Sequence, residues 1–212
     1  MANRMTGYEA TRHGLHAVAE RLLAGPQYRA TGTVRLRQLA GGFGTVRPYG
    51  DVLLVTVDGT ELVVSRVDGG ADRHPLRGTL GELAAATGLE YGGPDGVYAD
   101  GSGATPDLAL DLDADAAAVL ADAFATGAAA LDALGDPVIW PEHFDIAVTV
   151  DEVNYGVSPG DAAIAEPYAY VGPHRPRTGP FWNQSFGAAH PLREVPDVAA
   201  FFAEGRRLTA GE

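Results

Sequence analysis

The chain has 212 residues, of which 28 are acidic and 15 basic, giving a formal net charge of −13. It contains no cysteine, which excludes disulfides, thiolate catalysis and cysteine-ligated metal centres. Every basic residue is arginine, so Schiff-base chemistry and a phosphate-loop lysine are excluded as well. Residues 78–174 hold 17 Asp and Glu and no Arg, and such an acidic middle repels phosphate backbones. Nucleic acid is therefore not an expected partner.

Neither a targeting segment nor a membrane span is expected. Residues 1–14 are polar and lack the apolar core of a signal peptide. The most apolar stretch, 114–134, is interrupted by Asp115, Asp122 and Asp132, whose charges disfavour a span. The sequence therefore predicts a cytoplasmic protein that does not contact a membrane.

The N-terminal third predicts a helix followed by strands. A helix is expected over 6–24, capped by Thr6 and ended by Gly25-Pro26, and a half-buried strand over 33–39. Segments 51–57 and 60–67 flank Asp58-Gly59, a pair that favours a two-residue type I′ hairpin turn. That turn places Val55 opposite Leu62, Leu53 opposite Val64 and Asp51 opposite Arg66.

The middle of the chain predicts two helices separated by a long loop. A capping box of Thr79 and Glu82 begins a helix that Gly88 ends. The Gly- and Pro-rich segment 89–106 is typical of a functional loop or of a linker between lobes. Asp111 or Asp113 then caps an Ala-rich helix that reaches residue 135.

The last third predicts strands and a final helix. Segment 144–151 alternates, with Ile146 facing inward and Asp145 outward, and 167–172 and 181–187 are further predicted strands. Asp197 caps a helix over 198–208. Because helices and strands do not alternate regularly, we expect an α+β fold of mainly antiparallel sheet with packed helices. The chain forms one compact unit, 1–212, or two lobes, 1–90 and 107–212, joined by 89–106.

The most distinctive motif surrounds Trp140. Pro141 favours an extended Trp140, and His143 and Asp145 follow two residues apart on one face. A histidine beside a carboxylate can act as a general base or a metal ligand. The alternative is a structural corner in which Trp140 is packed and His143 is hydrogen-bonded.

Aromatic and polar residues cluster again further along. On a strand, Glu166, Tyr168 and Tyr170 share one face, and His174 follows in phase. Such a row suits a ligand pocket or a protein interface. The candidate ligand-binding residues are Trp140, His143, Asp145, Glu166, Tyr168, Tyr170, His174, Trp182, Asn183 and His190.

A second interpretation of the histidines is that they bind a metal ion. Convergence of His143, Glu166, His174 and His190 would allow one, as would His13, His16 and Glu20 on the first helix. The spacing does not establish either convergence. No metal ligand, catalytic residue or cofactor is therefore assigned from the sequence.

Three segments carry a resemblance to a family of uncharacterised bacterial proteins. They are Trp140–Thr149 (WPEHFDIAVT), Glu166–Tyr170 (EPYAY) and Phe181-Trp182. Members of that family share a Phe-Asp-Leu-Ala-Val-Thr strand and a later Tyr-Ala-Tyr segment, and Ile146 stands here in place of the Leu. The resemblance implies no established activity and no site residues.

Three functions follow as hypotheses. The first is a non-enzymatic module that binds a small ligand or a protein partner through the aromatic C-terminal sheet. The alternative is a hydrolase dependent on a metal or on His143 with Asp145 or Glu166. The third is an assembly role in which the acidic middle is the contact surface. The sequence predicts no oligomeric state.

Overall fold

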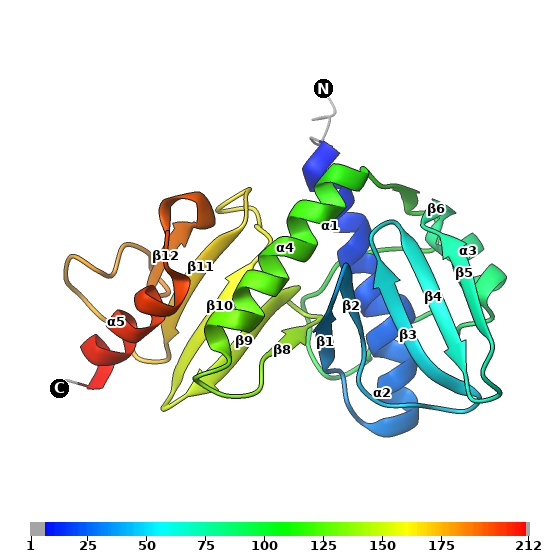
Figure 1. Ribbon diagram of the computed structural model, residues 1–212, viewed down its shortest axis with the longest axis horizontal. Helices are drawn as coiled ribbons and strands as arrows, with labels where there is room; N and C mark the ends of the chain where they lie inside the picture. Colours follow the sequence, from blue (N-terminus) through cyan, green and yellow to red (C-terminus); the bar gives the residue numbers. More distant parts are fainter. Residues whose placement is uncertain (1–6, 211–212) are drawn as a thin grey trace. The chain divides into compact units, whose positions relative to one another are not determined.

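The computed structural model describes residues 7–210, which divide into two compact units (Figure 1). Unit 1 runs to Asp122 and includes Ile139–Phe144. Unit 2 comprises Ala123–Val138 and the chain from Asp145 onward. The Gly- and Pro-rich segment 89–106 lies inside unit 1, so these boundaries differ from a division into 1–90 and 107–212.

Unit 1 begins with one helical rod that changes pitch along its length. The segment α1 (Gly7–Val18) passes into η1, a π-helical turn (Ala19–Ala24), and then into α2 (Gly25–Thr31) (Figure 1). The expected end at Gly25-Pro26 is wrong, because the helical rod continues from the π-turn through Pro26, which stands in the first turn of α2. The rod ends instead at Gly32, whose φ is 76°. The predicted cap, Thr6, lies outside the described residues.

The main sheet of unit 1 contains six antiparallel strands. In spatial order they are β8 (Val138–Trp140), β1 (Leu36–Leu39), β2 (Gly42–Thr45), β3 (Val52–Asp58), β4 (Glu61–Arg66) and β5 (Ala71–Pro75). A second sheet pairs β6 (Arg77–Thr79) with β7 (Ala109–Asp111). The π-turn packs against β1 and β2, and its Leu22 and Leu23 are fully buried.

The hairpin of β3 and β4 forms, but its register differs from the prediction. Its two loop residues are Gly59 and Thr60, and Val55 pairs with Val64 instead of Leu62. Gly59 has a φ of 59° at the first loop position, as a type II′ turn favours. The slip is two residues, so Val55, Leu62 and Val64 keep their predicted face. The predicted pairing of Leu53 with Val64 is wrong, because Leu53 lies at a bulge and is 51% exposed. A bulge before Leu54 still brings Asp51 within 2.7 Å of Arg66.

Both predicted mid-chain helices are present. The first, α3 (Leu80–Thr87), has the predicted Thr79–Glu82 capping box and ends at Gly88. The second, α4 (Ala114–Leu131), is capped by Asp113, whose Oδ1 accepts from Ala116 N at 2.8 Å. It ends four residues before the predicted end at residue 135. By length and mean hydropathy (1.4), α4 passes a test for membrane spans that core helices of soluble proteins also pass.

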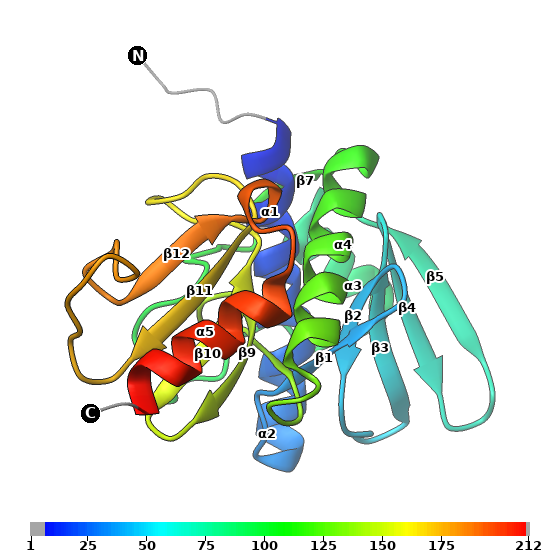
Figure 2. The same cartoon turned by 60° about the vertical axis from the view of Figure 1, so that its left-hand side comes forward.

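Unit 2 is an antiparallel sheet with helices packed on one face. Its strands, in spatial order, are β12 (Ala188–Pro191), β11 (Tyr168–Pro173), β10 (Val153–Ser158) and β9 (Asp145–Val150). Gly127 of α4 lies against Ile146 and Val157, and Gly205 of α5 (Val198–Ala210) lies against Val171. Figure 2 shows α5 lying across β10 and β11. The strand register places these three contacted residues on one face of the sheet.

Two further corrections concern unit 2. The predicted strand over 181–187 is absent, and the edge strand is β12, followed by the 3₁₀ turn η2 (Leu192–Glu194). The turn between β9 and β10 consists of Asp151 and Glu152, both with positive φ (52° and 61°), which is a type I′ turn without glycine. The final helix and its cap are confirmed, because Asp197 Oδ1 accepts from Ala200 N at 2.9 Å. The α+β fold with mainly antiparallel sheet is confirmed.

Candidate functional site

The candidate site is a cavity of about 400 Å³ in unit 1, between the π-turn and the loop 93–103. Two consecutive residues of the turn, Glu20 and Arg21, line one side. The loop supplies the rest, including Asp95, Tyr98 and Asp100. A π-turn inserts an extra residue into a helix and is frequent at functional sites. Here the Gly25 amide donates to the Glu20 carbonyl, the five-residue spacing of that turn.

Glu20 is the central charged group of the cavity. Only 3% of the residue is exposed. Its Oε2 accepts a hydrogen bond from the Ser102 amide at 3.0 Å and a short one from the Ser102 hydroxyl. Arg21 Nε lies 3.3 Å from the same oxygen without the geometry of a hydrogen bond. A buried carboxylate requires such donors, because its desolvation is otherwise costly.

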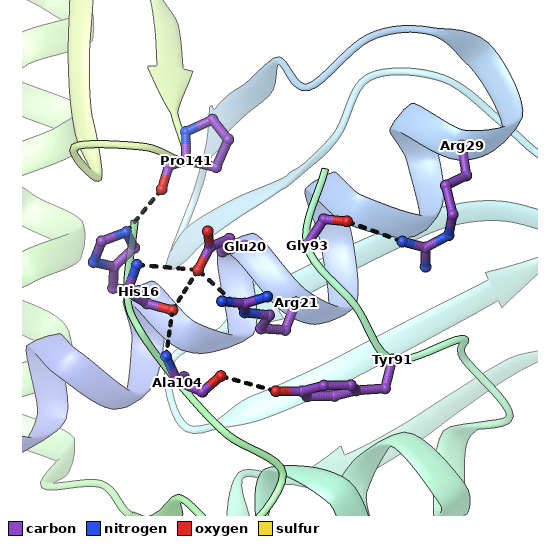
Figure 3. A network of polar contacts seen from close by, with 9 residues as sticks. His16, Glu20, Arg21, Arg29, Tyr91, Gly93, Ala104 and Pro141 are labelled. Atoms are coloured by element: carbon purple, nitrogen blue, oxygen red, sulfur yellow. Dashed lines mark hydrogen bonds and ion pairs between the residues drawn. The ribbon is translucent and has the colours of Figure 1, made fainter. Parts of the chain in front are cut away.

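Close backbone contact fixes the loop on the helical rod. The Gly92 amide donates to the Arg21 carbonyl at 3.1 Å, and Arg29 Nη1 donates to the Gly93 carbonyl at 3.0 Å. A Cβ atom on Gly25 would lie 1.7 Å from the Gly92 oxygen, so glycine is required there. Figure 3 shows the Tyr91 hydroxyl donating to the Ala104 carbonyl, at 2.9 Å, which ties the two ends of the loop together.

The cavity also contains polar atoms that the protein leaves incompletely bonded. The Tyr98 hydroxyl is buried near Glu20 but makes no hydrogen bond of good geometry within residues 7–210. Burial, and then the Glu20 carboxylate, raise the pKa of Tyr98 well above its usual range, so the phenol stays protonated and can donate. Buried polar groups are normally bonded, and an exception indicates a place for water or a ligand.

His16 lies one turn before Glu20 and joins the helical rod to the segment that follows β8. Its ring stacks on Phe144 with centroids 5.2 Å apart, and Nε2 donates to the Pro141 carbonyl at 2.7 Å (Figure 3). Burial lowers the pKa of His16, which favours the neutral ring. Its Nε2 is thus occupied, and no three His, Asp or Glu side chains within residues 7–210 are grouped to hold a metal ion.

Three of the sequence-predicted site residues come together in unit 2. Tyr168 and Tyr170 share a face as predicted, with ring centroids 6.2 Å apart. The Tyr170 hydroxyl crosses over Gly156 and makes a short hydrogen bond to Asp145. Burial and this carboxylate raise the pKa of Tyr170. Asp145 lies on the face opposite Ile146, as predicted, but it is covered rather than exposed to solvent (6% exposed).

The Trp140 motif is a structural corner. Trp140 is extended at the end of β8, as Pro141 predicts, and Arg35 lies 5.7 Å above its ring. The turn that follows has Phe144 at a φ of 52°, which ends the strand alternation before Asp145. The side chain of His143 is 70% exposed, and its nearest ion partner, Glu142, is 3.9 Å away. The predicted common face of His143 and Asp145 is therefore wrong.

The remaining predicted residues make separate contacts. Glu166 pairs with Arg193 at 2.9 Å, and His174 Nε2 lies 3.4 Å from Asn154. Asn183 exchanges two hydrogen bonds with the backbone of Ala189 across the sheet edge. Two others contact aromatic rings, Trp182 on Phe181 and His190 on Phe201. None of the ten predicted residues lines the Glu20 cavity.

The sequence indicated the loop of this cavity but not its central residues. The length and composition of segment 89–106 predict a functional loop or a linker between lobes. The sequence indicates Glu20 only as a candidate metal ligand. Ser102 lies in a Gly-Ser-Gly segment that lacks the flanking pattern of a nucleophile elbow, and Tyr98 belongs to no recognisable motif. The available signal was Gly25-Pro26 inside an otherwise continuous helical pattern, which marks the place where the helix changes pitch.

Comparison with known proteins adds no family. No family model, curated protein or solved structure matches the chain.

Proposed function

We propose that unit 1 is a binding module for a small, positively charged molecule, held in the Glu20 cavity. The observation that carries this proposal is a buried carboxylate beside a phenol without a well-formed hydrogen bond, in a cavity of about 400 Å³. Cavities of roughly 300–1,000 Å³ are the usual size for small-molecule sites. A bound amine would donate to the Glu20 and loop oxygens, and the Tyr98 hydroxyl would donate to an acceptor on the ligand.

The charge of the lining favours a cation. Three carboxylates line the cavity, Glu20, Asp95 and Asp100, against one guanidinium, that of Arg21. Arg21 lies beside Glu20, whereas neither aspartate has an ion-pair partner within the described part of the chain. A compact ammonium group fits this arrangement, and the face of the Tyr98 ring can add a cation–π contact.

The geometry favours binding over catalysis. Ser102 donates its hydroxyl to Glu20, which is the pairing of a nucleophile with a base. However, the same hydroxyl accepts from the Ala104 amide at 3.2 Å, and the Ser102 amide also donates to Glu20. These bonds hold the serine as an anchor of the loop. The exposed side chain of His143 does not support the alternative of a hydrolase that uses this histidine.

A thermal-shift measurement with putrescine, glycerol and acetate tests this proposal. Putrescine should raise the melting temperature progressively with its concentration, because a ligand that binds only the folded state stabilises that state by mass action. Glycerol and acetate at the same concentration and ionic strength should not. Equal responses to all three compounds would contradict a cation site.

A matched pair of variants locates the effect. In D95N/D100N two carboxylates of the lining become neutral, whereas in D107N/D111N two exposed aspartates of unit 1 outside the cavity do. Both variants change the net charge equally. Putrescine should stabilise D107N/D111N as it does the parent protein and lose its effect on D95N/D100N. An equal loss in both variants would show that putrescine responds only to overall charge.

A further inference from the structure

A second cavity, of about 370 Å³, lies in unit 2. It is formed by the turn between β9 and β10, the segment after β11 and the last turns of α5. Three arginines line it, Arg175, Arg177 and Arg206, together with two acidic residues, Asp151 and Glu152. Guanidinium groups therefore outnumber carboxylates in this cavity, although the chain as a whole is strongly acidic.

The described part of unit 2 contains five arginines, and their distribution is uneven. Two of them lie outside the cavity in close ion pairs, Arg193 with Glu166 and Arg207 with Glu204. The other three all line the cavity. Basic residues commonly complement the carbonyl groups at a helix C-terminus, which accounts for Arg206. It does not account for Arg175 and Arg177, which come from the segment after β11.

The three guanidinium groups are held to different degrees. Arg177 Nη2 donates to the Thr209 carbonyl at 3.5 Å, which places this side chain against the end of α5. Arg175 Nη2 lies 3.4 Å from Glu152 in an exposed ion pair, and such pairs are weak. Arg206 is exposed and has no ion-pair partner among residues 7–210. Arg175 and Arg206 can therefore turn toward a bound anion without breaking a buried contact.

We propose that this cavity binds the oxyanion group, phosphate or carboxylate, of a small molecule. The planar guanidinium fork donates two parallel hydrogen bonds to either group, which a lysine could not do. Arg175 and Arg206 approach from different segments, so that they can contact different oxygens of one anion. This site lies in unit 2 and does not depend on the Glu20 cavity.

Titration with inorganic phosphate, followed by ¹H–¹⁵N NMR at constant ionic strength, tests the proposal. We expect saturable shifts confined to 151–155, 173–177 and 205–210. The variant R175A/R206A should bind phosphate at least about tenfold more weakly, the loss expected when a charged hydrogen-bond donor is removed. The variant R193A/R207A has the same net charge and should bind like the parent protein. Shifts without saturation, or equal loss in both variants, would overturn the proposal.

A parallel titration with acetate distinguishes the two oxyanions. Saturation by acetate alone would identify the group as a carboxylate, and saturation by phosphate alone as a phosphate; binding of neither overturns the site. Should R175A/R206A lose the cooperative melt of the parent protein, R206K replaces it, because it keeps the charge and removes only the fork. Phosphate must then bind R206K more weakly than it binds the parent protein.

Discussion

The interaction between Glu20 and Ser102 predicts a stability change of defined size. In E20Q the side chain keeps its length and one carbonyl acceptor but loses its charge. Hydrogen bonds to a charged group are worth about 1.5–3 kcal/mol and neutral ones about 0.5–1.5 kcal/mol. Ser102 donates two such bonds to a carboxylate that is almost fully buried, so solvent screens them little. E20Q should therefore lower the free energy of unfolding by about 2 kcal/mol.

Urea denaturation followed by tryptophan fluorescence measures this change in unit 1. The two tryptophans lie one in each unit, so a W182F background leaves Trp140 as the reporter of unit 1. We expect E20Q and S102A to be coupled by about 1 kcal/mol in a double-mutant cycle, because each removes part of the same contact. E90Q is the control, because Glu90 pairs with Arg29 on the surface and should matter by less than about 0.5 kcal/mol. Additive effects of E20Q and S102A would refute the reasoning.

Three further predictions concern packing, pH and the unit 2 sheet. G25A should lose about 2 kcal/mol or more of unfolding free energy, because its Cβ would overlap the Gly92 oxygen. G7A is the control, because a Cβ on Gly7 would lie in open space, and it should unfold like the parent protein. Equal urea midpoints for G25A and G7A would contradict the contact at Gly25. Because burial lowers the pKa of His16, the unfolded state takes up its proton first, so the melting temperature should fall as the pH drops below about 6.5. H16Q should flatten that dependence, and an unchanged profile would show that another group titrates. Y170F removes the phenol that donates to Asp145 and should lower the free energy of unfolding by about 1–3 kcal/mol, measured by urea denaturation. An unchanged free energy of unfolding would show that this hydrogen bond does not stabilise the protein.

Much of the fold followed from local patterns in the sequence. The capping box at Thr79 and the cap at Asp197 each have a local physical cause, and the structure contains both. The strand β9 forms, but its burial does not alternate as predicted, because Asp145 and Ala147 are buried as well as Ile146. Where the prediction failed, the deciding interaction was not local. Pro26 predicts the end of a helix only if the helix keeps its α pitch, and the π-turn before it removes that conflict.

Turn chemistry caused the other errors. Asp58-Gly59 predicts a type I′ turn, but Gly59 can also occupy the first position of a type II′ turn, and the structure uses that register. The turn between β9 and β10 could not be predicted in this way, because Asp151 and Glu152 adopt positive φ although neither is glycine. The predicted strand over 181–187 failed because Asn183 bonds the backbone of β12 with its side chain and not with a strand ladder.

The candidate site was harder to predict than the fold. Clusters of aromatic and histidine residues are typical of binding sites, yet Trp182 and His190 pack on other aromatic rings and His143 lies at the surface. The Glu20 cavity depends on a contact between residues 82 positions apart, and one acidic residue in a helix carries no sign of such a partner. Only the length of the Gly- and Pro-rich loop pointed to this part of the chain.

The most direct test of the proposed function is to find which amides respond to putrescine. A ¹H–¹⁵N NMR titration of the uniformly labelled protein at constant ionic strength provides this map. We expect saturable shifts at Glu20, Arg21 and residues 93–103, and none in the sheet of unit 2. Saturable shifts confined to unit 2, or no saturation anywhere, would contradict a cation-binding site at Glu20.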